Sequence, residues 1–349
     1  MINKEFGSDF HSCNKEFILN KKQNFFFDNK DFSFFLSGRS ALYALIKYGV
    51  ENYGWTKVYI PSYYCQDVIE SLSELNIEIV VFQSNPDDLL LNYDFFEDNK
   101  TSVFINVNYF GVKKNNTEIF KKIVVVDDLT HCIQGVKESR SDYVFGSLRK
   151  QLPIPLGGFL YSPHKLKLPK GKGSILADQA AENKTLGMFL KNEYLQNRFL
   201  NKDLYRSYYS KAEEQLIKLY KDYKLPSLAE NILETLNVEK ILKKKESNIK
   251  LALKHLENYL SYLFSVKESS LGLLLLFDSN TQRDFVRRKL IQSNIYPAIL
   301  WPNQKTDIDI NYQNRFLFLH LDYRYSEEDI IYITTELKKS IQECQKQKL

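Results

Sequence analysis

The sequence predicts an α/β protein, with a large domain built on a mainly parallel sheet flanked by helices and a small C-terminal α+β domain. Between about residues 32 and 162, short apolar runs alternate with amphipathic segments. This alternation is typical of a mainly parallel sheet with helices on both faces. A charged helical region follows from about 178 to 260, and a shorter mixture of strands and helices closes the chain.

The elements of the large domain follow in order from these patterns. Apolar residues at helical spacing predict helices over 40–54 and 66–76. Short apolar runs bounded by turn residues predict strands. These runs lie at 57–61, 77–83, 102–111, 122–128, 142–148 and 157–163.

The helical region carries charges throughout, with aromatic and apolar residues three to four positions apart. We interpret its tyrosines and leucines as core and interface contacts. We place the domain boundary inside this region, near residue 240, which gives a large domain of 1–240 and a small domain of 241–349. The small domain is expected to hold strands at 270–279, 295–302 and 316–322 and helices at 281–294 and 326–343.

Composition limits the classes of protein that the chain can represent. Hydrophobic residues make up 44% of the 349 residues, enough for a sizeable core, and 48 basic residues against 43 acidic ones give a mixed surface. That balance provides no argument for nucleic acid binding. The four cysteines are far apart and show no CxxC spacing, so we expect neither a disulfide framework nor a zinc site. The N-terminus lacks a signal-peptide pattern and no apolar run is long enough to cross a bilayer, so a soluble, cytoplasmic protein is expected.

A candidate anion site lies in LSGRSALYAL, residues 36–45. The turn at Gly38 leads straight into a helix, so the backbone amides of Gly38, Arg39 and Ser40 belong to a helix N-terminus. The dipole and the unpaired amides of such an end favour a phosphate. Ser37 or Ser40 acting only as a helix cap is the alternative.

A second candidate is KIVVVDDLTHC, residues 122–132, where a strand ends in Asp127 and Asp128. Ligands of open α/β sheets bind at the carboxyl ends of parallel strands. His131 follows three residues after Asp128 and could lie beside the same ligand, or be a core histidine. The two carboxylates could instead hold a divalent metal with a nucleotide-sugar, which would indicate a glycosyltransferase.

The third candidate is Lys150, in SLRKQLPIPLGG. Pro153 and Pro155 exclude a regular helix after it, which predicts a loop or strand end. The largely apolar neighbours are expected to desolvate the ammonium and lower its pKa, as an amine nucleophile requires. The alternative is an ordinary surface lysine.

Taken in order, the phosphate-binding turn, the strand-end aspartate, Ser147-x-x-Lys150 and the Gly-Gly strand resemble the fold-type I enzymes that use pyridoxal phosphate. Within these, the set is similar to the DegT/StrS-type sugar aminotransferases, as a divergent branch. The resemblance covers about residues 32–345. It implies pyridoxal 5′-phosphate as cofactor and a homodimer with shared active sites.

The resemblance also implies roles for individual residues. Gly38, Arg39, Ser40 and Ser147 match the positions that hold the cofactor phosphate. Asp128 matches the aspartate that pairs with the pyridine nitrogen, and His131 the residue beside the ring. Lys150 matches the Schiff-base lysine, which later serves as the base that moves a proton.

Other positions match less closely. The family usually stacks an aromatic side chain from a Pro-Ser-x-x-aromatic segment on the ring, whereas PSYYCQ has Cys65 at that offset, with Tyr63 and Tyr64 just before it. We therefore take Tyr63 and Cys65 as cofactor contacts. Asn108 and Tyr109, from the segment NYFG near the cofactor, are expected at the substrate.

By resemblance, the chain moves an amino group from an amino acid, glutamate by preference, to a keto or aldehyde acceptor such as a nucleotide-linked keto-sugar of surface-polysaccharide biosynthesis. Arg315 or Arg324 could bind the donor carboxylate. Alternatives are a dehydratase, decarboxylase or aldolase of the same fold, and a non-catalytic descendant. The related sugar dehydratases carry histidine at the lysine position, so Lys150 disfavours them.

Overall fold

The computed structural model describes residues 4–7, 9–19, 26–27, 31–86, 93–112, 117–198, 201–257 and 264–347. These residues form two compact units. One unit is Phe10–Val238, and the other joins the first nine residues to the chain from Glu239 onward. The N-terminal residues therefore fold with the C-terminal part of the chain.

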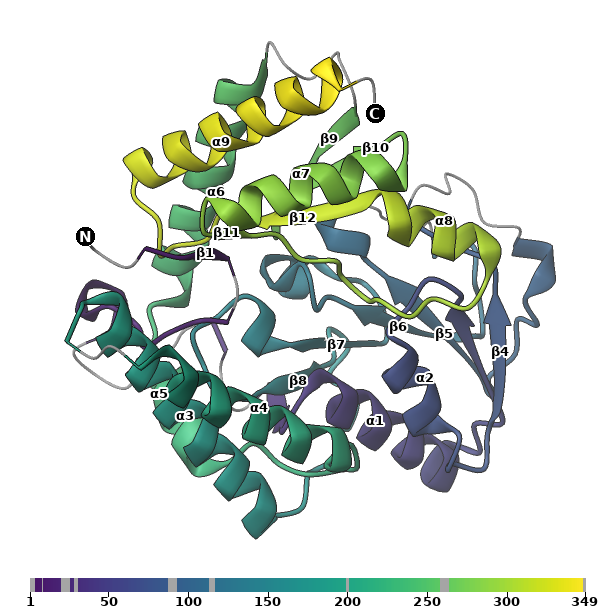
Figure 1. Ribbon diagram of the computed structural model, residues 1–349. Coiled ribbons are helices and arrows are strands. Elements are labelled where there is room, and N and C mark those ends of the chain that lie inside the picture. Colours follow the sequence, from purple (N-terminus) through teal and green to yellow (C-terminus); the bar gives the residue numbers. More distant parts are fainter. Residues whose placement is uncertain are drawn as a thin grey trace. The chain divides into compact units, whose positions relative to one another are not determined.

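The unit Phe10–Val238 is built on a seven-stranded sheet with the strand order β2-β8-β7-β6-β5-β3-β4 (Figure 1). Strands β3 to β7 run parallel to one another, and β8 is antiparallel to both β7 and β2. This confirms the expected α/β class with a mainly parallel, mixed sheet. The strands are β2 Phe32–Phe35, β3 Lys57–Pro61, β4 Glu78–Phe82, β5 Ser102–Val107, β6 Val124–Asp128, β7 Tyr143–Ser147 and β8 Gly158–Tyr161.

Helices flank this sheet. Helix α1 packs on β7 and β8, and helices α3 and α4 lie side by side (Figure 1). The predicted helical region is divided into separate helices, and the helix predicted over 66–76 already ends at Leu72. The helices of this unit are α1 Gly38–Tyr53, α2 Gln66–Leu72, α3 Ile175–Leu195, α4 Lys202–Lys218 and α5 Ser227–Thr235. Within the described residues, no helix is both long enough and apolar enough to cross a bilayer.

Two connections of the sheet contain only short 3₁₀ turns where the structure describes them. Between β5 and β6 lies η3 (Tyr109–Gly111), and between β6 and β7 lies η4 (Ile133–Glu138). Phe110 in η3 has a φ of 58°, outside the helical region, so that segment cannot continue as a helix. The loops after β5 and β6 therefore lie directly at the strand ends.

Helix α1 begins where it does because the chain packs tightly at that point. Ser37 caps the helix and also forms a bridge with Gly157. A Cβ atom at Gly158 would lie 2.2 Å from the carbonyl carbon of Ser37 and 2.4 Å from the nitrogen of Gly38. The missing side chain at Gly158 thus lets β8 support the first turn of α1.

The second unit has a three-stranded antiparallel sheet in the order β12-β10-β9 and a short parallel pair of β1 with β11. The strand predicted over 295–302 is reduced to two residues, because Pro297 follows them and Trp301 and Asn303 have positive φ angles. The elements are β1 Phe6–Gly7, α6 Val238–Leu256, β9 Phe264–Glu268, β10 Gly272–Phe277, α7 Asn280–Gln292, β11 Ile295–Tyr296, α8 Asp307–Arg315, β12 Phe316–His320 and α9 Glu327–Lys346.

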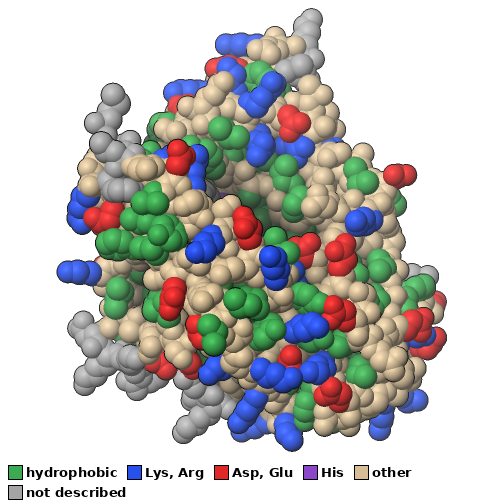
Figure 2. All heavy atoms as spheres, turned by 60° about the horizontal axis from the view of Figure 1, so that its bottom comes forward, with side chains coloured by type: hydrophobic (Ala, Val, Ile, Leu, Met, Phe, Trp, Pro, Cys, Tyr) green, Lys and Arg blue, Asp and Glu red, His purple; other side chains and the backbone are tan. Residues whose placement is uncertain are grey.

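The surface agrees with the mixed charge of the sequence. On the face drawn in Figure 2, acidic and basic side chains are interspersed with polar and apolar ones. This face shows no broad basic field of the kind that attracts a nucleic acid backbone.

Gly158→Ala tests the close contact between β8 and α1. The added methyl group would overlap the backbone of Ser37 and Gly38, so we expect the free energy of unfolding to fall by about 3 kcal/mol. Urea denaturation measures this change. Gly173→Ala is the matched control, because its Cβ would only touch the Lys224 side chain at 3.6 Å, and we expect a change below about 1 kcal/mol. Equal stability of the two variants would contradict the packing argument.

Candidate functional site

The first turn of α1 meets the end of β7. Ser37 Oγ accepts a hydrogen bond from the backbone nitrogen of Ser40 at 3.1 Å, so Ser37 is a helix cap. A Cβ atom at Gly38 would lie 3.1 Å from the backbone nitrogen of Ser147. The helix N-terminus and Ser147 therefore lie together, as expected for groups that hold one phosphate.

The side chain of Arg39 takes no part in this arrangement. Its Nη2 donates to the carbonyl oxygen of Leu216 at 2.6 Å, in the last turn of α4. Its guanidinium also lies over the Tyr220 ring, 5.9 Å from the centroid. The Arg39 side chain thus links α1 to α4. Only the backbone amide of Arg39, in the first turn of α1, belongs to the candidate phosphate site.

Asp128 lies at the carboxyl end of β6 and is 3% exposed. Its Oδ1 accepts a hydrogen bond from the backbone nitrogen of Thr130 at 2.8 Å, and its Oδ2 accepts one from the hydroxyl of Tyr64. Burial raises the pKa of the Asp128 carboxyl, although both hydrogen bonds act in the opposite direction. Burial next to this carboxylate also raises the pKa of Tyr64 well above its usual value, so the phenol stays protonated.

Thr130 connects this carboxylate to the segment that carries Lys150. Its hydroxyl accepts a hydrogen bond from the backbone nitrogen of Ser147 at 3.2 Å, and its carbonyl oxygen accepts one from Gln151 Nε2 at 3.1 Å. Together with its own N–H to Asp128, Thr130 therefore holds the end of β6 and the end of β7 in one network.

His131 is 1% exposed and its ring lies against Phe110, with centroids 5.1 Å apart at 32°. Burial, with a smaller effect from the Lys150 ammonium, lowers the pKa of His131 to about 3. The imidazole is therefore neutral at physiological pH. It provides a flat, uncharged surface near Asp128 and Lys150.

Lys150 ends the 3₁₀ turn η5 (Leu148–Lys150), directly after β7. The predicted loop or strand end is thus present, but the predicted desolvation is wrong because Lys150 is exposed. Its apolar neighbours Leu148 and Leu152 are fully buried beneath the turn and leave the lysine on the solvent side. Its charge still acts on neighbouring residues. Burial and Asp67 raise the pKa of the Cys65 thiol, and the Lys150 ammonium partly offsets that rise.

The aromatic segment before α2 is arranged differently from what the sequence suggested. Tyr63 is buried, and its carbonyl oxygen accepts a hydrogen bond from the Tyr109 hydroxyl at 2.9 Å. Cys65 is half-buried at the start of α2. Tyr64, which we had not assigned, is the residue of this segment whose hydroxyl meets Asp128.

The two arginines considered for the donor carboxylate lie in the second unit. Arg324 is engaged bidentately by Asp322, with Nε–Oδ1 and Nη2–Oδ2 distances of 2.8 Å, and its side chain is 3% exposed. Arg315 ends α8 and is half-buried, and its Nε has no hydrogen-bond partner among the described residues. Arg315 is therefore the better candidate of the two.

Asp127 and Asp128 point to opposite faces of the sheet, as neighbouring residues of a strand must. Asp127 binds Asn106 Nδ2 at 2.8 Å and Ser139 Oγ at 2.6 Å, away from the partners of Asp128. In the part of the chain that the structure describes, no group of three His, Cys, Asp or Glu side chains is placed to hold a metal ion. One metal ion held by both aspartates, as a glycosyltransferase site would need, does not fit this geometry.

Sequence reasoning missed Tyr64, Thr130 and Gln151. The signal for Tyr64 was present, because two consecutive tyrosines precede α2 and only one of them can face the strand end. Thr130 offered the signal of a hydroxyl two residues after a strand-end aspartate. Gln151 gave no signal, since its contact with Thr130 depends on how the turn η5 folds.

No protein-family model matches the sequence, and no curated protein matches it. Solved structures do match. A Streptococcus pneumoniae protein, Spr1654, named as a sugar aminotransferase and solved in its PLP form, has a TM-score of 0.62 at 13% identity, over 98% of this chain and 100% of that one. Helicobacter pylori PseC, an aminotransferase involved in the biosynthesis of pseudoaminic acid, has a TM-score of 0.59 at 14% identity, over 97% and 100%.

A third match is the Escherichia coli GDP-4-keto-6-deoxy-D-mannose-3-dehydratase with bound hydrated PLP, with a TM-score of 0.57 at 13% identity, over 88% of this chain and 87% of that one. These likenesses show that the chain has the fold of the fold-type I pyridoxal phosphate enzymes. They confirm the expected structural resemblance to the DegT/StrS-type sugar aminotransferases, at the low identity of a divergent branch. At 13–14% identity these matches establish the fold only. The reaction has to be inferred from the residues of the site.

The residues present fit pyridoxal phosphate in three respects. A helix N-terminus lies close to Ser147 at Gly38, a buried carboxylate ends the neighbouring strand, and the charge of a lysine further along the chain acts on His131. One contact departs from this fit. The Tyr64 hydroxyl already donates to Asp128 Oδ2, so a pyridine nitrogen would share this carboxylate with Tyr64.

The lowered pKa of His131 predicts an acid-dependent loss of stability. Its folded pKa of about 3 lies below the unfolded value of about 6.5, so the unfolded chain takes up the proton first as the pH falls. Between pH 7 and pH 5 the wild type should lose about 2 kcal/mol more than His131→Gln, which cannot titrate. Urea denaturation at both pH values measures this difference. Equal losses in both proteins would show that His131 is not buried in its neutral form.

Proposed function

We propose that this protein is a pyridoxal phosphate-dependent aminotransferase. It moves an amino group from an amino acid, glutamate by preference, to a keto or aldehyde acceptor such as a nucleotide-linked keto-sugar of surface-polysaccharide biosynthesis. The observation that supports it most is the buried Asp128 in one network with Thr130 and Ser147, with Lys150 one turn further on, in a chain of fold-type I architecture. The proposal rests on this network and on the resemblance together.

Each residue has a part in this proposal. The amides at the start of α1, with Ser147, would hold the cofactor phosphate, and Asp128 would keep a proton on the pyridine nitrogen. Neutral His131 would lie beside the ring. When bound, pyridoxal phosphate supplies an electron-accepting ring that stabilises negative charge on a substrate carbon.

Lys150 would carry the proton transfers. It ends the turn η5 directly after β7, on the segment that Thr130 holds beside Asp128, and a neutral amine at this position would take a proton from the substrate and return it. In the second unit, Arg315 would bind the carboxylate of the amino donor, because a guanidinium can engage a carboxylate through two parallel hydrogen bonds.

Another pyridoxal phosphate reaction on the same fold is the second candidate. The structural match to a dehydratase with bound hydrated PLP supports it, since the ring stabilises several kinds of carbanion and the protein decides which bond breaks. Lys150 favours transamination. By the resemblance, the related sugar dehydratases carry histidine at this position and so lack the lysine that would serve as the base.

Assembly into a homodimer with shared active sites is part of the proposal. Apolar side chains are exposed along the helices α3 and α4, among them Ile175 at 77%, Phe189 at 52% and Ile217 at 61%. A second copy of the chain covering them would remove this apolar surface from water. Sedimentation velocity of the purified protein would report a dimer, and a monomer at all concentrations would remove this part of the proposal.

Lys150→Ala tests the cofactor assignment. Wild-type protein mixed with pyridoxal phosphate should develop a visible absorption band, and borohydride reduction should fix the cofactor on the peptide that contains Lys150. Lys150→Ala should give neither, whereas Lys170→Ala, which changes an exposed lysine of the same unit, should behave as wild type. Absence of the band in the wild type would reject the assignment. An adduct on any other lysine would move the site away from Lys150.

If the absorption band forms and the adduct maps to Lys150, the band can be used to screen for amino donors and acceptors. An amino donor should convert the band in a single turnover, and an acceptor should restore it. Loss of the amino group from the donor without its appearance on any acceptor would favour the second candidate over transamination.

A further inference from the structure

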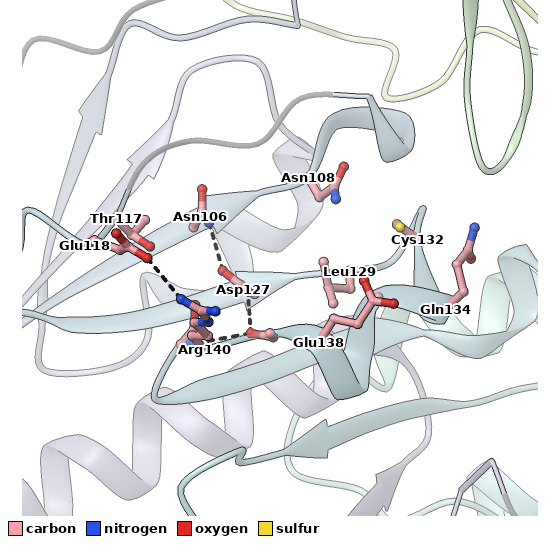
Figure 3. Close-up of a pocket in the computed structure, with 13 residues that line it drawn as sticks. Asn106, Asn108, Thr117, Glu118, Asp127, Leu129, Cys132, Gln134, Glu138 and Arg140 are labelled. Atoms are coloured by element: carbon pink, nitrogen blue, oxygen red, sulfur yellow. Dashed lines mark hydrogen bonds and ion pairs between the residues drawn. The ribbon is translucent and has the colours of Figure 1, made fainter.

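A cavity of about 410 Å³ opens beside the ends of β5 and β6 (Figure 3). Asn106 and Asp127 are register partners in these strands, and Asn108 and Leu129, just past the strand ends, also line the cavity. Alternate residues of the same strands, such as Asp128, belong to the other face. The volume lies within the range of about 300–1,000 Å³ that is typical of small-molecule sites.

One wall of this cavity is a fixed polar group. Asp127 Oδ1 accepts a hydrogen bond from Asn106 Nδ2 at 2.8 Å, and Oδ2 accepts one from Ser139 Oγ at 2.6 Å (Figure 3). Ser139 Oγ in turn accepts from the backbone nitrogen of Ser141 at 3.2 Å. The carboxylate is therefore held in one orientation, and each of its oxygens can accept a further hydrogen bond.

Two amide oxygens in the lining lack a hydrogen-bond partner among the described residues. Asn108 is only 9% exposed, and its Oδ1 is buried without a partner among the described residues. Gln134, on the turn η4, has a buried Oε1 that likewise lacks one within the described chain. A buried amide oxygen without a partner costs about 1–3 kcal/mol, which a ligand that donates hydrogen bonds would recover.

Charge and shape narrow the class of ligand. The lining contains the carboxylates of Asp127, Glu118 and Glu138 against the single guanidinium of Arg140, which pairs with Glu118 at 3.3 Å. This excess of acceptors disfavours phosphates and carboxylates. The lining therefore favours a ligand that donates hydrogen bonds and carries no negative charge.

The remaining wall is apolar. Leu129 and Cys132 are 5% and 9% exposed and also line the cavity. A ligand with hydrogen-bond donors along its edge and an apolar face fits such a combination of walls. A sugar ring has both features, because its hydroxyl groups project sideways and its C–H groups form a face.

We propose that this cavity binds a monosaccharide-like, hydroxyl-rich molecule that is uncharged or positively charged. Asn108 and Gln134 accept hydrogen bonds from its hydroxyl or amino groups, Asp127 accepts a further one, and Leu129 packs against the ring face. This site is separate from the proposed cofactor site and does not depend on the proposed function, because it lies on the other face of the sheet.

Binding of three simple sugars to the purified full-length chain, without added cofactor, tests this proposal. D-Glucosamine, D-glucose and D-glucuronate share the ring and differ in charge. Isothermal titration should show saturable binding of the first two, with D-glucuronate at least tenfold weaker. No saturable binding of D-glucosamine or D-glucose, or equal affinity for D-glucuronate, would overturn the proposal.

Variants place the binding in this cavity. Asn108→Ala and Gln134→Ala should each weaken D-glucosamine binding about fivefold, the effect of one lost hydrogen bond. Asn52→Ala, at an exposed asparagine near the end of α1, is the matched control and should bind as wild type, as should Lys150→Ala. If circular dichroism shows that Asn108→Ala is unfolded, Gln134→Ala decides the test, because Gln134 is only half-buried. Unchanged affinity in the folded cavity variants would reject the site.

Discussion

The burial of one carboxylate, Asp128, is the constraint on which the candidate site depends. A charged group at this depth is stable only if hydrogen bonds replace the water it loses, and the Thr130 N–H and the Tyr64 hydroxyl provide them. Thr130 can serve Asp128 only if the chain turns sharply after β6. The same turn allows its hydroxyl and carbonyl oxygen to hold Ser147 and Gln151, on either side of Lys150. The same residue, Thr130, therefore both solvates the Asp128 carboxylate and positions the segment that carries Lys150.

Successive side chains of a strand point to opposite faces of the sheet, so neighbouring residues of β6 belong to two different sites. In β6, Asp128 accepts hydrogen bonds from Tyr64 and Thr130, whereas Asp127 accepts them from Asn106 and Ser139 and lines the cavity. The connections after β5 and β6 hold only 3₁₀ turns where they are described, so no α-helix from these segments covers that end of the sheet. A pair of adjacent aspartates that reads as one acidic motif in sequence is thus two unrelated groups in space.

Alternation of strand and helix was enough to predict the α/β class and most strands of the large sheet, because buried parallel strands are continuous apolar runs. The same reasoning could not find which tyrosine of the pair before α2 meets Asp128, because that choice depends on the direction of one loop. It also assigned a buried environment to Lys150 from its apolar neighbours, whereas the turn η5 buries Leu148 and leaves the lysine outside. Local composition gives the burial of a segment, but not of each side chain in a tight turn.

The contact between Tyr64 and Asp128 favours one protonation state of a ring bound there. A neutral phenol donates to the carboxylate in the present arrangement, and burial raises the pKa of both groups. A neutral ring nitrogen offers no proton and would leave the carboxylate worse solvated than Tyr64 does. A protonated nitrogen donates a charge-assisted hydrogen bond, about twice as strong as a neutral one, and its positive charge also compensates for burial. A ring bound beside Asp128 would therefore be held in its cationic form, which is the state in which it accepts electrons best.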